Sequence, residues 1–289
     1  MPPQSLNLFD PPPLNTGVLI LGFDGWMDGG EVSTGTTDWL ADALDARIVG
    51  EIDPGNFYIY NFPGSMEVAA LFRPHGKIED GLITEFDLPR NTFFADPSMN
   101  LAIFRGKEPN FGWAEFADAI FTTCRRMSIQ RIYFVGSVAG LSPHSREPRI
   151  FCSVSDAKMK PEMESYGLNF SDYEGPVSFV TYLMTLAPSH GLEMATVVAE
   201  IPAYVHSHNP KSIEAVLRKL SAIAGLSLDL DPLRSASDEW EKKVNEVVAE
   251  KNELGDYIHK LEEDYDNEVF NTQMSDLKDW LEDKGLQVD

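Results

Sequence analysis

The chain has 289 residues, of which 43% are hydrophobic and 24% are charged. This length allows one large domain or two ordinary ones, and the apolar share is enough for a packed core, which excludes a wholly disordered chain. The formal net charge is −23. Because phosphate backbones and anionic lipids repel so acidic a chain, we expect no binding to nucleic acid or to a membrane surface.

The first residues and the two cysteines bear on where the protein works. Residues 1–16 are rich in proline and lack the basic and apolar segments of a signal peptide, so we expect an extended N-terminal arm that lies on a surface. The apolar run at 17–23 is too short to cross a bilayer. Cys124 and Cys152 are too few for a disulfide framework or a zinc site, and we expect two buried, reduced thiols. These features predict a cytoplasmic protein.

Short apolar runs alternate with amphipathic stretches along residues 17–228, which we expect to form the core domain. The predicted strands are 17–23, 47–52, 101–104, 131–138, 149–154 and 194–201, and the predicted helices are 31–44, 113–127, 176–190 and 210–224. The stretches 57–62, 68–72 and 82–86 alternate in polarity and predict a local antiparallel excursion. The repeated order of strand, helix and strand predicts an α/β fold with a mostly parallel sheet covered on both faces.

Residues 229–289 differ in composition and predict an acidic helical extension. They hold 19 acidic and 7 basic residues, and Ser235 with Asp238 fits the capping pattern of a helix start. Apolar residues then recur at alternating spacings of four and three, which is a heptad stripe interrupted by one lysine. The stripe is Trp240, Val244, Val247, Lys251, Leu254, Ile258, Leu261 and Tyr265, and a second, shorter helix continues it with Phe270, Met274, Leu277 and Leu281. A stripe this narrow covers its own domain, a neighbouring helix or another subunit, and these alternatives stay open.

The loop at 22–31 joins the first strand to the first helix and contains four glycines. Its spacing matches neither a dinucleotide-binding loop nor a P-loop. Asp24, Asp28 and Glu31 would repel phosphate. They either hold a metal ion, or Asp28 and Glu31 favour the helix start.

A second polar segment follows the strand at 131–138. Ser137 stands second in Gly-Ser-Val-Ala-Gly, whereas a nucleophile elbow has its serine third, so a tight turn is the favoured interpretation. His144, Arg146 and Arg149 then give the only concentrated positive charge along the sequence. Arg146 can bind a carboxylate or phosphate, or it can pair with the acidic residues of this chain.

His206 and His208 lie near the end of the strand at 194–201, at a spacing that lets two histidines share a metal. No third ligand is near, so a surface loop is the favoured interpretation and we expect no metal.

The carboxyl ends of parallel strands meet at one edge of a sheet, where ligands usually bind. We therefore expect a candidate ligand-binding pocket lined by Asp24, Trp26, Ser137, His144 and Arg146. There Trp26 would stack on a ring, His144 would act as acid or base, and Arg146 would hold an anion. No residue is assigned as catalytic, and we expect no cofactor.

Several blocks, in order along residues 17–226, resemble the proteasome assembly chaperone 2 family, in particular its bacterial members. They are Leu19–Gly35, Glu51–Pro54 with Phe57-Tyr58, Gly136 leading to His144-Ser145-Arg146, Ser155-Asp156, Tyr173–Pro176, Ile201–Val205 and Asn209–Lys211. The chain departs from the family at Ala203, where histidine is common, and at the inserted Glu147.

The resemblance implies a three-layer αβα fold, like that of nucleoside phosphorylases and related hydrolases, and association with itself or with other proteins. Eukaryotic and archaeal relatives act as chaperones of proteasome assembly, some through a C-terminal hydrophobic-Tyr-X tail that residues 285–289 do not match. Bacterial members often carry the label ATP-grasp carboligase, but no glycine-rich nucleotide loop with a lysine supports it here.

Three hypotheses about function follow. The first is a non-enzymatic oligomeric scaffold or assembly chaperone. Such a protein would form a homo-oligomer and could also bind a protein partner. The second is an enzyme that acts on a small anionic or nucleoside-like ligand in the pocket described above. The third, a metal hydrolase that uses Asp24, Asp28 and the histidines, has the least support.

Overall fold

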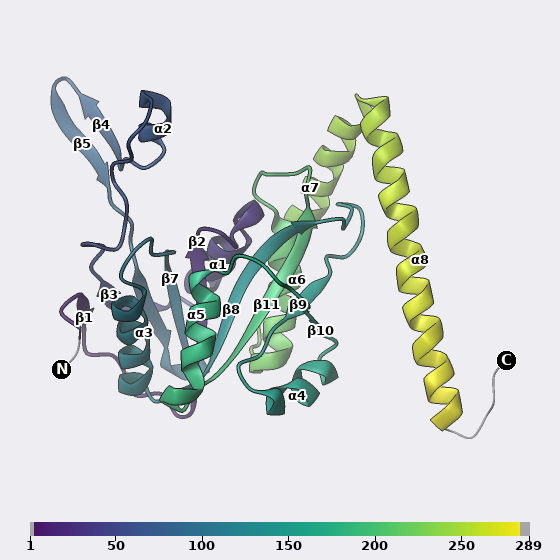
Figure 1. Ribbon diagram of the computed structural model, residues 1–289, viewed down its shortest axis with the longest axis horizontal. Coiled ribbons are helices and arrows are strands. Elements are labelled where there is room, and N and C mark those ends of the chain that lie inside the picture. Colours follow the sequence, from purple (N-terminus) through teal and green to yellow (C-terminus); the bar gives the residue numbers. More distant parts are fainter. Residues whose placement is uncertain (1–2, 284–289) are drawn as a thin grey trace.

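A mixed nine-stranded sheet forms the centre of the protein, in a computed structural model that describes residues 3–283 (Figure 1). In spatial order the strands are β1 (Leu6–Leu8), β3 (Arg47–Ile52), β6 (Thr92–Asp96), β7 (Leu101–Lys107), β2 (Gly17–Asp24), β8 (Ile129–Gly140), β11 (Glu193–Pro202), β9 (Ile150–Cys152) and β10 (Asn169–Phe170). The four central strands, β7, β2, β8 and β11, are parallel. The α/β fold is confirmed.

Beyond the four central strands the sheet turns antiparallel on both sides, which is the main difference from the predicted topology, although the outermost strand β10 is again parallel to β9. β1, β3, β6 and β7 pair antiparallel in succession, and β9 runs antiparallel to β11. Only residues 97–100 connect β6 to β7, which is too short for a parallel crossover. The proline-rich start adds β1 as an edge strand beside β3, so part of the expected arm belongs to the sheet.

Two hydrophobic cores, one on each face of the sheet, give three layers. Leu19, Leu21 and Phe23 point to the core shared with α3 (Trp113–Met127) and α5 (Phe179–Leu186). Ile20 points to the opposite core, shared with α1 (Val32–Ala43) and α6 (Pro210–Ala224). Successive side chains of a strand alternate between faces, so burial on both faces explains the unbroken apolar run of β2. The short helix α4 (Lys160–Ser165) lies at the end of the sheet near β10 (Figure 1).

Residues 54–90 include an arm that projects beyond the sheet, and here the predicted excursion is partly wrong. The hairpin pairs β4 (His75–Glu79) with β5 (Leu82–Asp87), whereas 68–72 belongs mostly to α2 (Met66–Ala70) and 57–62 forms no strand. Asp80 and Gly81 both have positive φ angles, as the two-residue turn of a tight hairpin requires. The Asp-Gly turn signal therefore outweighs the alternation that the prediction used.

The helix predicted at 176–190 is shorter than expected. Its α-helical part is α5, a 3₁₀ turn follows at 187–190, and Pro176 lies before the helix. Pro188 provides a reason for the early end, because proline cannot donate the backbone hydrogen bond that continues an α-helix.

The tail forms two helices, but their boundary differs from the predicted one. α7 (Asp231–Ala249) begins at a proline-containing first turn, and Ser235 lies inside it, where its hydroxyl donates to the carbonyl of Asp231 (3.2 Å). α8 (Asn252–Asp283) runs unbroken past Tyr265. The predictions for the tail also involve Leu281 and the last residues of the chain. The side chain of Leu281 and the whole of residues 284–289 lie outside what the structure describes.

The inner part of the predicted stripe packs on the protein itself. Ile258 and Leu261 of the stripe are buried where α8 packs, and Leu233, which lies in α7 before the stripe, is buried against α6. Within residues 3–283, no helix combines the length and the hydropathy that a membrane span requires. The division of the chain into an N-terminal arm, a core domain and a helical extension, with boundaries after residues 16 and 228, remains a proposal.

Candidate functional site

The loop after β2 packs against the end of β8, as expected for neighbouring parallel strands. The backbone N–H of Ser137 donates to the carbonyl of Met27 (2.8 Å), and its hydroxyl donates to the carbonyl of Gly29 (2.6 Å). At Gly136 a Cβ would come within 2.7 Å of the Met27 carbonyl oxygen, so the approach requires glycine. Ser137 is buried and joins the loop after β2 to β8. The predicted tight turn at 136–140 is wrong, because these residues continue β8 and pair in parallel with β11.

Asp28 caps the first helix of the core. Its carboxylate accepts hydrogen bonds from the backbone N–H groups of Ser33 (2.8 Å) and Thr34 (3.0 Å) and from the Thr34 hydroxyl (2.8 Å). Burial raises the pKa of Asp28 to about 6, although these hydrogen bonds act in the opposite direction. The helix-start interpretation of Asp28 is confirmed. Glu31 pairs instead with His208 (3.0 Å), and among residues 3–283 no three His, Cys, Asp or Glu side chains are grouped to hold a metal ion.

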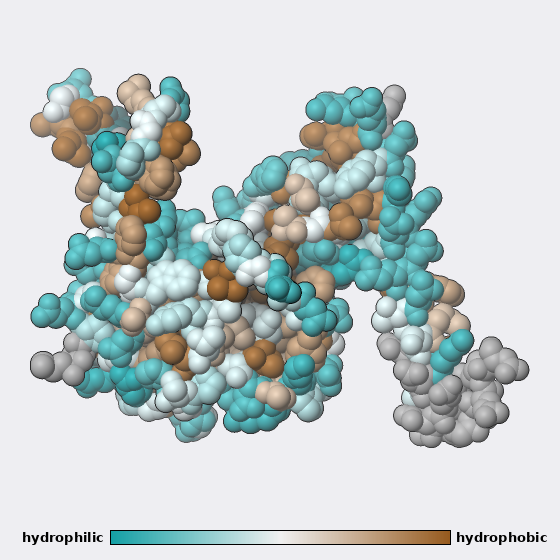
Figure 2. Space-filling model, in the orientation of Figure 1, coloured by the Kyte–Doolittle hydropathy of each residue, from teal (hydrophilic) through white to brown (hydrophobic). Residues whose placement is uncertain are grey.

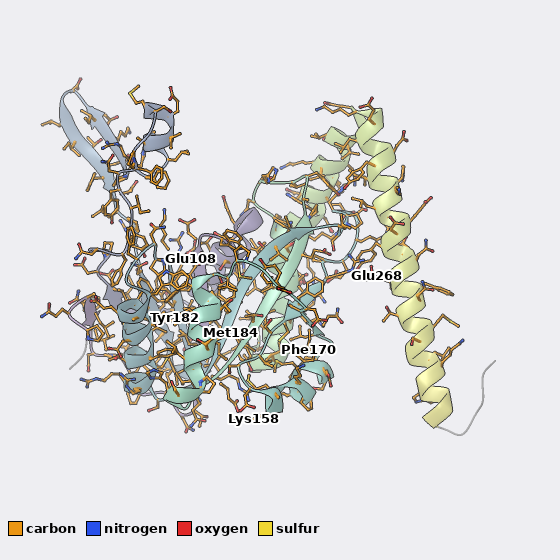
Figure 3. The ribbon with its side chains drawn as sticks, viewed as in Figure 1. Glu108, Lys158, Phe170, Tyr182, Met184 and Glu268 are labelled. Carbon is orange, nitrogen blue, oxygen red and sulfur yellow. The ribbon has the colours of Figure 1, made fainter. Side chains whose placement is uncertain are left out.

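Trp26 lies at the mouth of a cavity of about 270 Å³ that Ser137, Ile201 and His206 also line. Its indole is largely exposed. The backbone beneath it is fixed by Glu108, which is labelled in Figure 3. Its carboxylate accepts hydrogen bonds from the N–H groups of Trp26 (3.0 Å) and Phe179 (2.7 Å) and so joins this loop to the start of α5.

Asp24 faces a different cavity. It ends β2, beside Lys107 at the end of β7, with 3.8 Å between its carboxylate and Nζ of the lysine. Both side chains line a cleft of about 340 Å³ between the sheet and the base of the arm.

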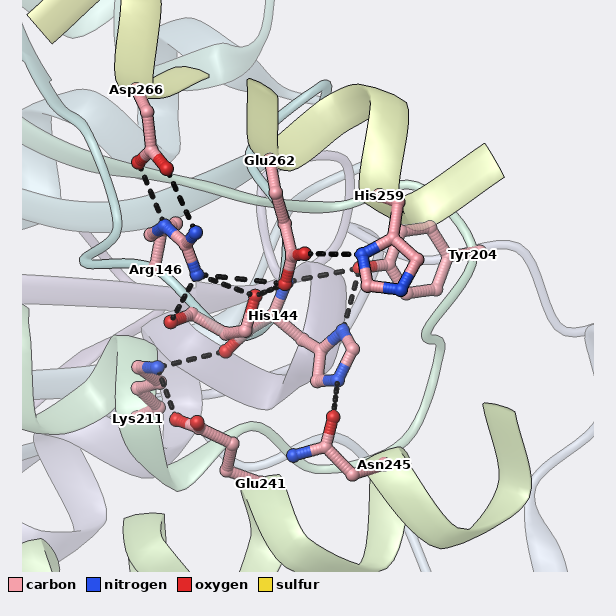
Figure 4. Close-up of polar contacts among 10 residues, drawn as sticks. His144, Arg146, Tyr204, Lys211, Glu241, Asn245, His259, Glu262 and Asp266 are labelled. Carbon is pink, nitrogen blue, oxygen red and sulfur yellow. Dashed lines mark hydrogen bonds and ion pairs between the residues drawn. The ribbon is translucent and has the colours of Figure 1, made fainter. Parts of the chain in front are cut away.

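His144 is buried under the tail helices and fully bonded (Figure 4). Its Nδ1 lies 2.8 Å from the hydroxyl of Tyr204, and its Nε2 lies 3.0 Å from Oδ1 of Asn245 in α7. Since an amide oxygen only accepts, the network assigns the proton to Nε2 and makes Nδ1 the acceptor from Tyr204. Burial lowers the pKa of His144, against the opposing effect of the Asn245 hydrogen bond, so the neutral ring is favoured.

Arg146 is held by carboxylates of α8. Its Nε and Nη2 each donate to one oxygen of Asp266 at 2.8 Å, and Nη1 lies 3.5 Å from Glu262. The hydrogen bond from Arg146 lowers the pKa of Asp266. Ser145 also donates to Glu262, which fixes the same turn of α8 (Figure 4).

Arg149 adds a second anchor on α8, at Glu268, two residues beyond Asp266. It pairs with Glu200 of β11 (3.0 Å) and Glu268 of α8 (2.7 Å), and its guanidinium lies 4.4 Å from the ring centre of Tyr265. Glu268 is labelled on α8 in Figure 3. The self-pairing alternative for this cationic segment is therefore confirmed, and the bonded anions come from the chain's own tail.

The five residues expected to line one pocket lie in three places. Asp24 faces the cleft below the arm, Trp26 and Ser137 line the cavity at the ends of β2 and β8, and His144 and Arg146 lie beneath α7 and α8. Sequence reasoning did not identify the partners that cover the last two, namely Tyr204, Lys211, Glu241, Asn245, Glu262 and Asp266. The excess of acidic residues in the tail could have indicated these partners, because those carboxylates neutralise the cationic segment.

If the ion pairs hold α8 on the core, Arg146→Gln should loosen that helix. We expect the amides of residues 258–270 to exchange with deuterium about tenfold faster, because a bidentate charge-assisted pair is lost. Exchange in β2 and β8 should stay unchanged. Arg126→Gln, an exposed arginine on α3, is the matched control for charge, and equal acceleration in that variant would contradict the prediction.

His144 should make stability depend on pH. Its pKa in the folded protein lies below the ordinary value of 6.5, so the unfolded chain takes up a proton first as the pH falls. Stability is then lost from pH 6.5 downward, by at most about 1.4 kcal/mol per pH unit. Urea unfolding of wild type and His144→Gln at pH 7.5, 6.5 and 5.5 measures this loss.

The variant should lose less stability on acidification than the wild type. Asp28, whose pKa is raised, acts in the opposite sense below about pH 6, but it is present in both proteins and cancels in the comparison. Parallel curves for the two proteins would contradict the assignment to His144.

Comparison with known structures shows the same fold in other proteins. A Mycobacterium tuberculosis protein of unknown function is 21% identical, with a TM-score of 0.82 over 96% of this chain and 94% of that one. A proteasome-assembly chaperone homologue of the same organism is 25% identical, with a TM-score of 0.72 over 83% of this chain and 99% of that one.

A curated relative, a pro-apoptotic serine protease of Meyerozyma guilliermondii, is 24% identical over 231 residues, or 69% of this chain. The chain spans only 22% of the length of that protein. The PAC2 family matches residues 22–248, which cover most of the chain and include β8, the cationic segment after it and all but the last residue of α7. On that match the chain belongs to the PAC2 family.

Proposed function

We propose that this chain is a non-enzymatic scaffold of the assembly-chaperone type, which acts by holding protein partners. Membership of the PAC2 family supports this, as does the shared fold of a protein described as a proteasome-assembly chaperone homologue. We further propose that it works as a homo-oligomer in the cytoplasm. Two buried cysteines without a disulfide agree with a reducing compartment.

The observation that carries the proposal is how the polar groups at the strand ends are used. His144 and Arg146 are the groups best suited to acid–base chemistry or to anion binding. They are hydrogen-bonded to Asn245 and Asp266 of the tail instead. Lys211 similarly bonds Glu241 of α7 and the carbonyl of His144. These contacts stabilise the tail on the core, which is a structural role.

Reconstitution with purified α- and β-type proteasome subunits tests this function. We expect the chain to form a complex with one of the subunits at micromolar concentration and to raise the rate of particle formation several-fold, measured by native electrophoresis and size-exclusion chromatography. An unrelated protein of similar length and net charge is the control for electrostatic effects. Absence of any complex, or equal stimulation by the control, would contradict a proteasome-directed scaffold.

The cavity beside Trp26 and Ser137 favours a second candidate function, the binding of a small anionic or nucleoside-like ligand by an enzyme of phosphorylase or hydrolase type. Its support is an open cavity at the carboxyl ends of parallel strands with an exposed indole at its mouth. Asp24 faces another cleft, and His144 and Arg146 do not line this cavity because they are bonded to Asn245 and Asp266 of the tail.

Thermal unfolding with nucleosides, each alone and with inorganic phosphate, measures binding at this cavity. A ligand that stacks on Trp26 should raise the unfolding temperature saturably in the wild type and much less in Trp26→Ala. Tyr173→Ala removes an exposed aromatic ring elsewhere and serves as the control. No saturable shift with any of these compounds would remove this candidate.

A further inference from the structure

The projecting arm exposes apolar side chains on both of its faces. Leu82 and Phe86 lie on one face of β5, and Ile83 lies on the other, opposite Ile78 of β4. These four side chains are 63–74% exposed. A two-stranded hairpin is marginally stable unless one of its faces is packed, so an arm of this composition requires a partner surface. Figure 2 shows apolar side chains gathered on this projection.

The outer half of α8 is a second uncovered apolar surface, at the opposite end of the molecule (Figures 1 and 2). Glu268 is the last residue of α8 that bonds the core among the side chains that the structure describes. Beyond it the exposed apolar residues follow helical spacing: Phe270, Met274, Leu277 and Trp280. In Figure 2 this half of the helix stands clear of the body. The inner half buries Ile258 and Leu261, so only the outer half remains without a cover.

The charges of the two surfaces are complementary. The cleft at the base of the arm is lined by four cations, Arg73, Arg90, Arg105 and Lys107, and by two acidic residues, Asp24 and Asp87. Arg105 pairs with Asp38 (2.8 Å) and Lys107 lies 3.8 Å from Asp24, so Arg73 and Arg90 carry the excess positive charge. This reverses the balance of a chain that has 46 acidic and 23 basic residues. Residues 270–283 of α8 include four acidic residues and one basic residue. An acidic, amphipathic helix therefore matches a cationic cleft flanked by apolar side chains, which is the usual chemistry of helix-in-groove recognition.

We propose that the arm and its basal cleft in one copy of this chain bind the outer half of α8 from a second copy. The inference rests on the oligomeric scaffold proposed above and names its contact. Since the two surfaces differ and lie at opposite ends of one molecule, the contact is heterologous: every copy offers one arm and one helix. Repetition of such a contact closes into a ring when the rotation between copies permits.

Light scattering of the full chain with two double variants tests the contact. Leu82→Ser with Phe86→Ser changes only the arm, and Phe270→Ser with Leu277→Ser changes only the helix. All four positions are exposed, so each variant should keep the fold, which circular dichroism checks. We expect the wild type to have a multiple of the monomer mass, and each variant to dissociate at a concentration at least about tenfold higher.

Mixing the two variants distinguishes a heterologous contact from a symmetric one. The arm variant keeps an intact helix and the helix variant keeps an intact arm, so an equimolar mixture should form a mixed dimer that neither variant forms alone. A symmetric contact between two arms, or between two helices, would give no mixed dimer in this experiment. Phe9→Ser with Leu141→Ser, two exposed apolar positions outside both surfaces, is the matched control and should assemble as the wild type does.

The outcomes separate this inference from the proposed function. A monomeric wild type, assembly that survives both double substitutions, or a mixture without the mixed dimer overturns the contact between arm and helix. In the second and third cases an oligomeric scaffold still stands, assembled through other surfaces. An intact oligomer that binds no proteasome subunit overturns the proposed function and leaves the contact between copies in place.

Discussion

Pairing between the acidic tail and the few cations at the strand ends is the interaction on which the rest of this structure depends. Arg149 is the clearest example of this pairing. Its side chain is only 16% exposed, and it bonds both Glu200 of β11 and Glu268 of α8. Removing one partner from a pair of this kind leaves a poorly solvated charge behind, which costs more than the pair contributes when intact. The sheet and the tail are therefore tied together by groups that neither part can leave unpaired.

This pairing also decides what the edge of the sheet can do. In many α/β proteins the carboxyl ends of parallel strands form a ligand site. Here α7 and α8 bring Asn245 and Asp266 onto His144 and Arg146, so a helix of the same chain lies where a ligand would (Figure 4). A site filled in this way favours a structural role over a chemical one. Two spaces stay open at the carboxyl ends of the central strands, the cavity beside Trp26 and the cleft that Asp24 and Lys107 line.

The ion pairs have a further consequence for the surface. They hold the inner half of α8 on the core, so the outer half extends past its last anchor with Phe270 and Leu277 exposed. The arm at the other end of the molecule has the same property, since both of its faces carry apolar residues that nothing in residues 3–283 covers. Two exposed apolar surfaces on one chain agree with a protein that functions by binding other proteins or other copies of itself.

The sequence by itself determined the elements whose apolar period is strong. The helices at 113–127 and 210–224 have the predicted bounds, and the continuous apolar run of β2 correctly indicated burial on both faces. The position of Ser137 in its motif correctly argued against a nucleophile elbow, although it lies in β8 and not in the predicted turn. Local information suffices in these cases, since period, capping and turn chemistry act within a few residues.

Only the tertiary structure decided which polar groups meet. Arg146 and Asp266 are 120 residues apart, and no local pattern selects one carboxylate among the 46 acidic residues of the chain. The same limit applies to the cleft below the arm, where Arg90 and Lys107 come together from separate segments. Parallel strand order and the path of the tail set these contacts, and both depend on how whole elements pack rather than on the residues next to each side chain.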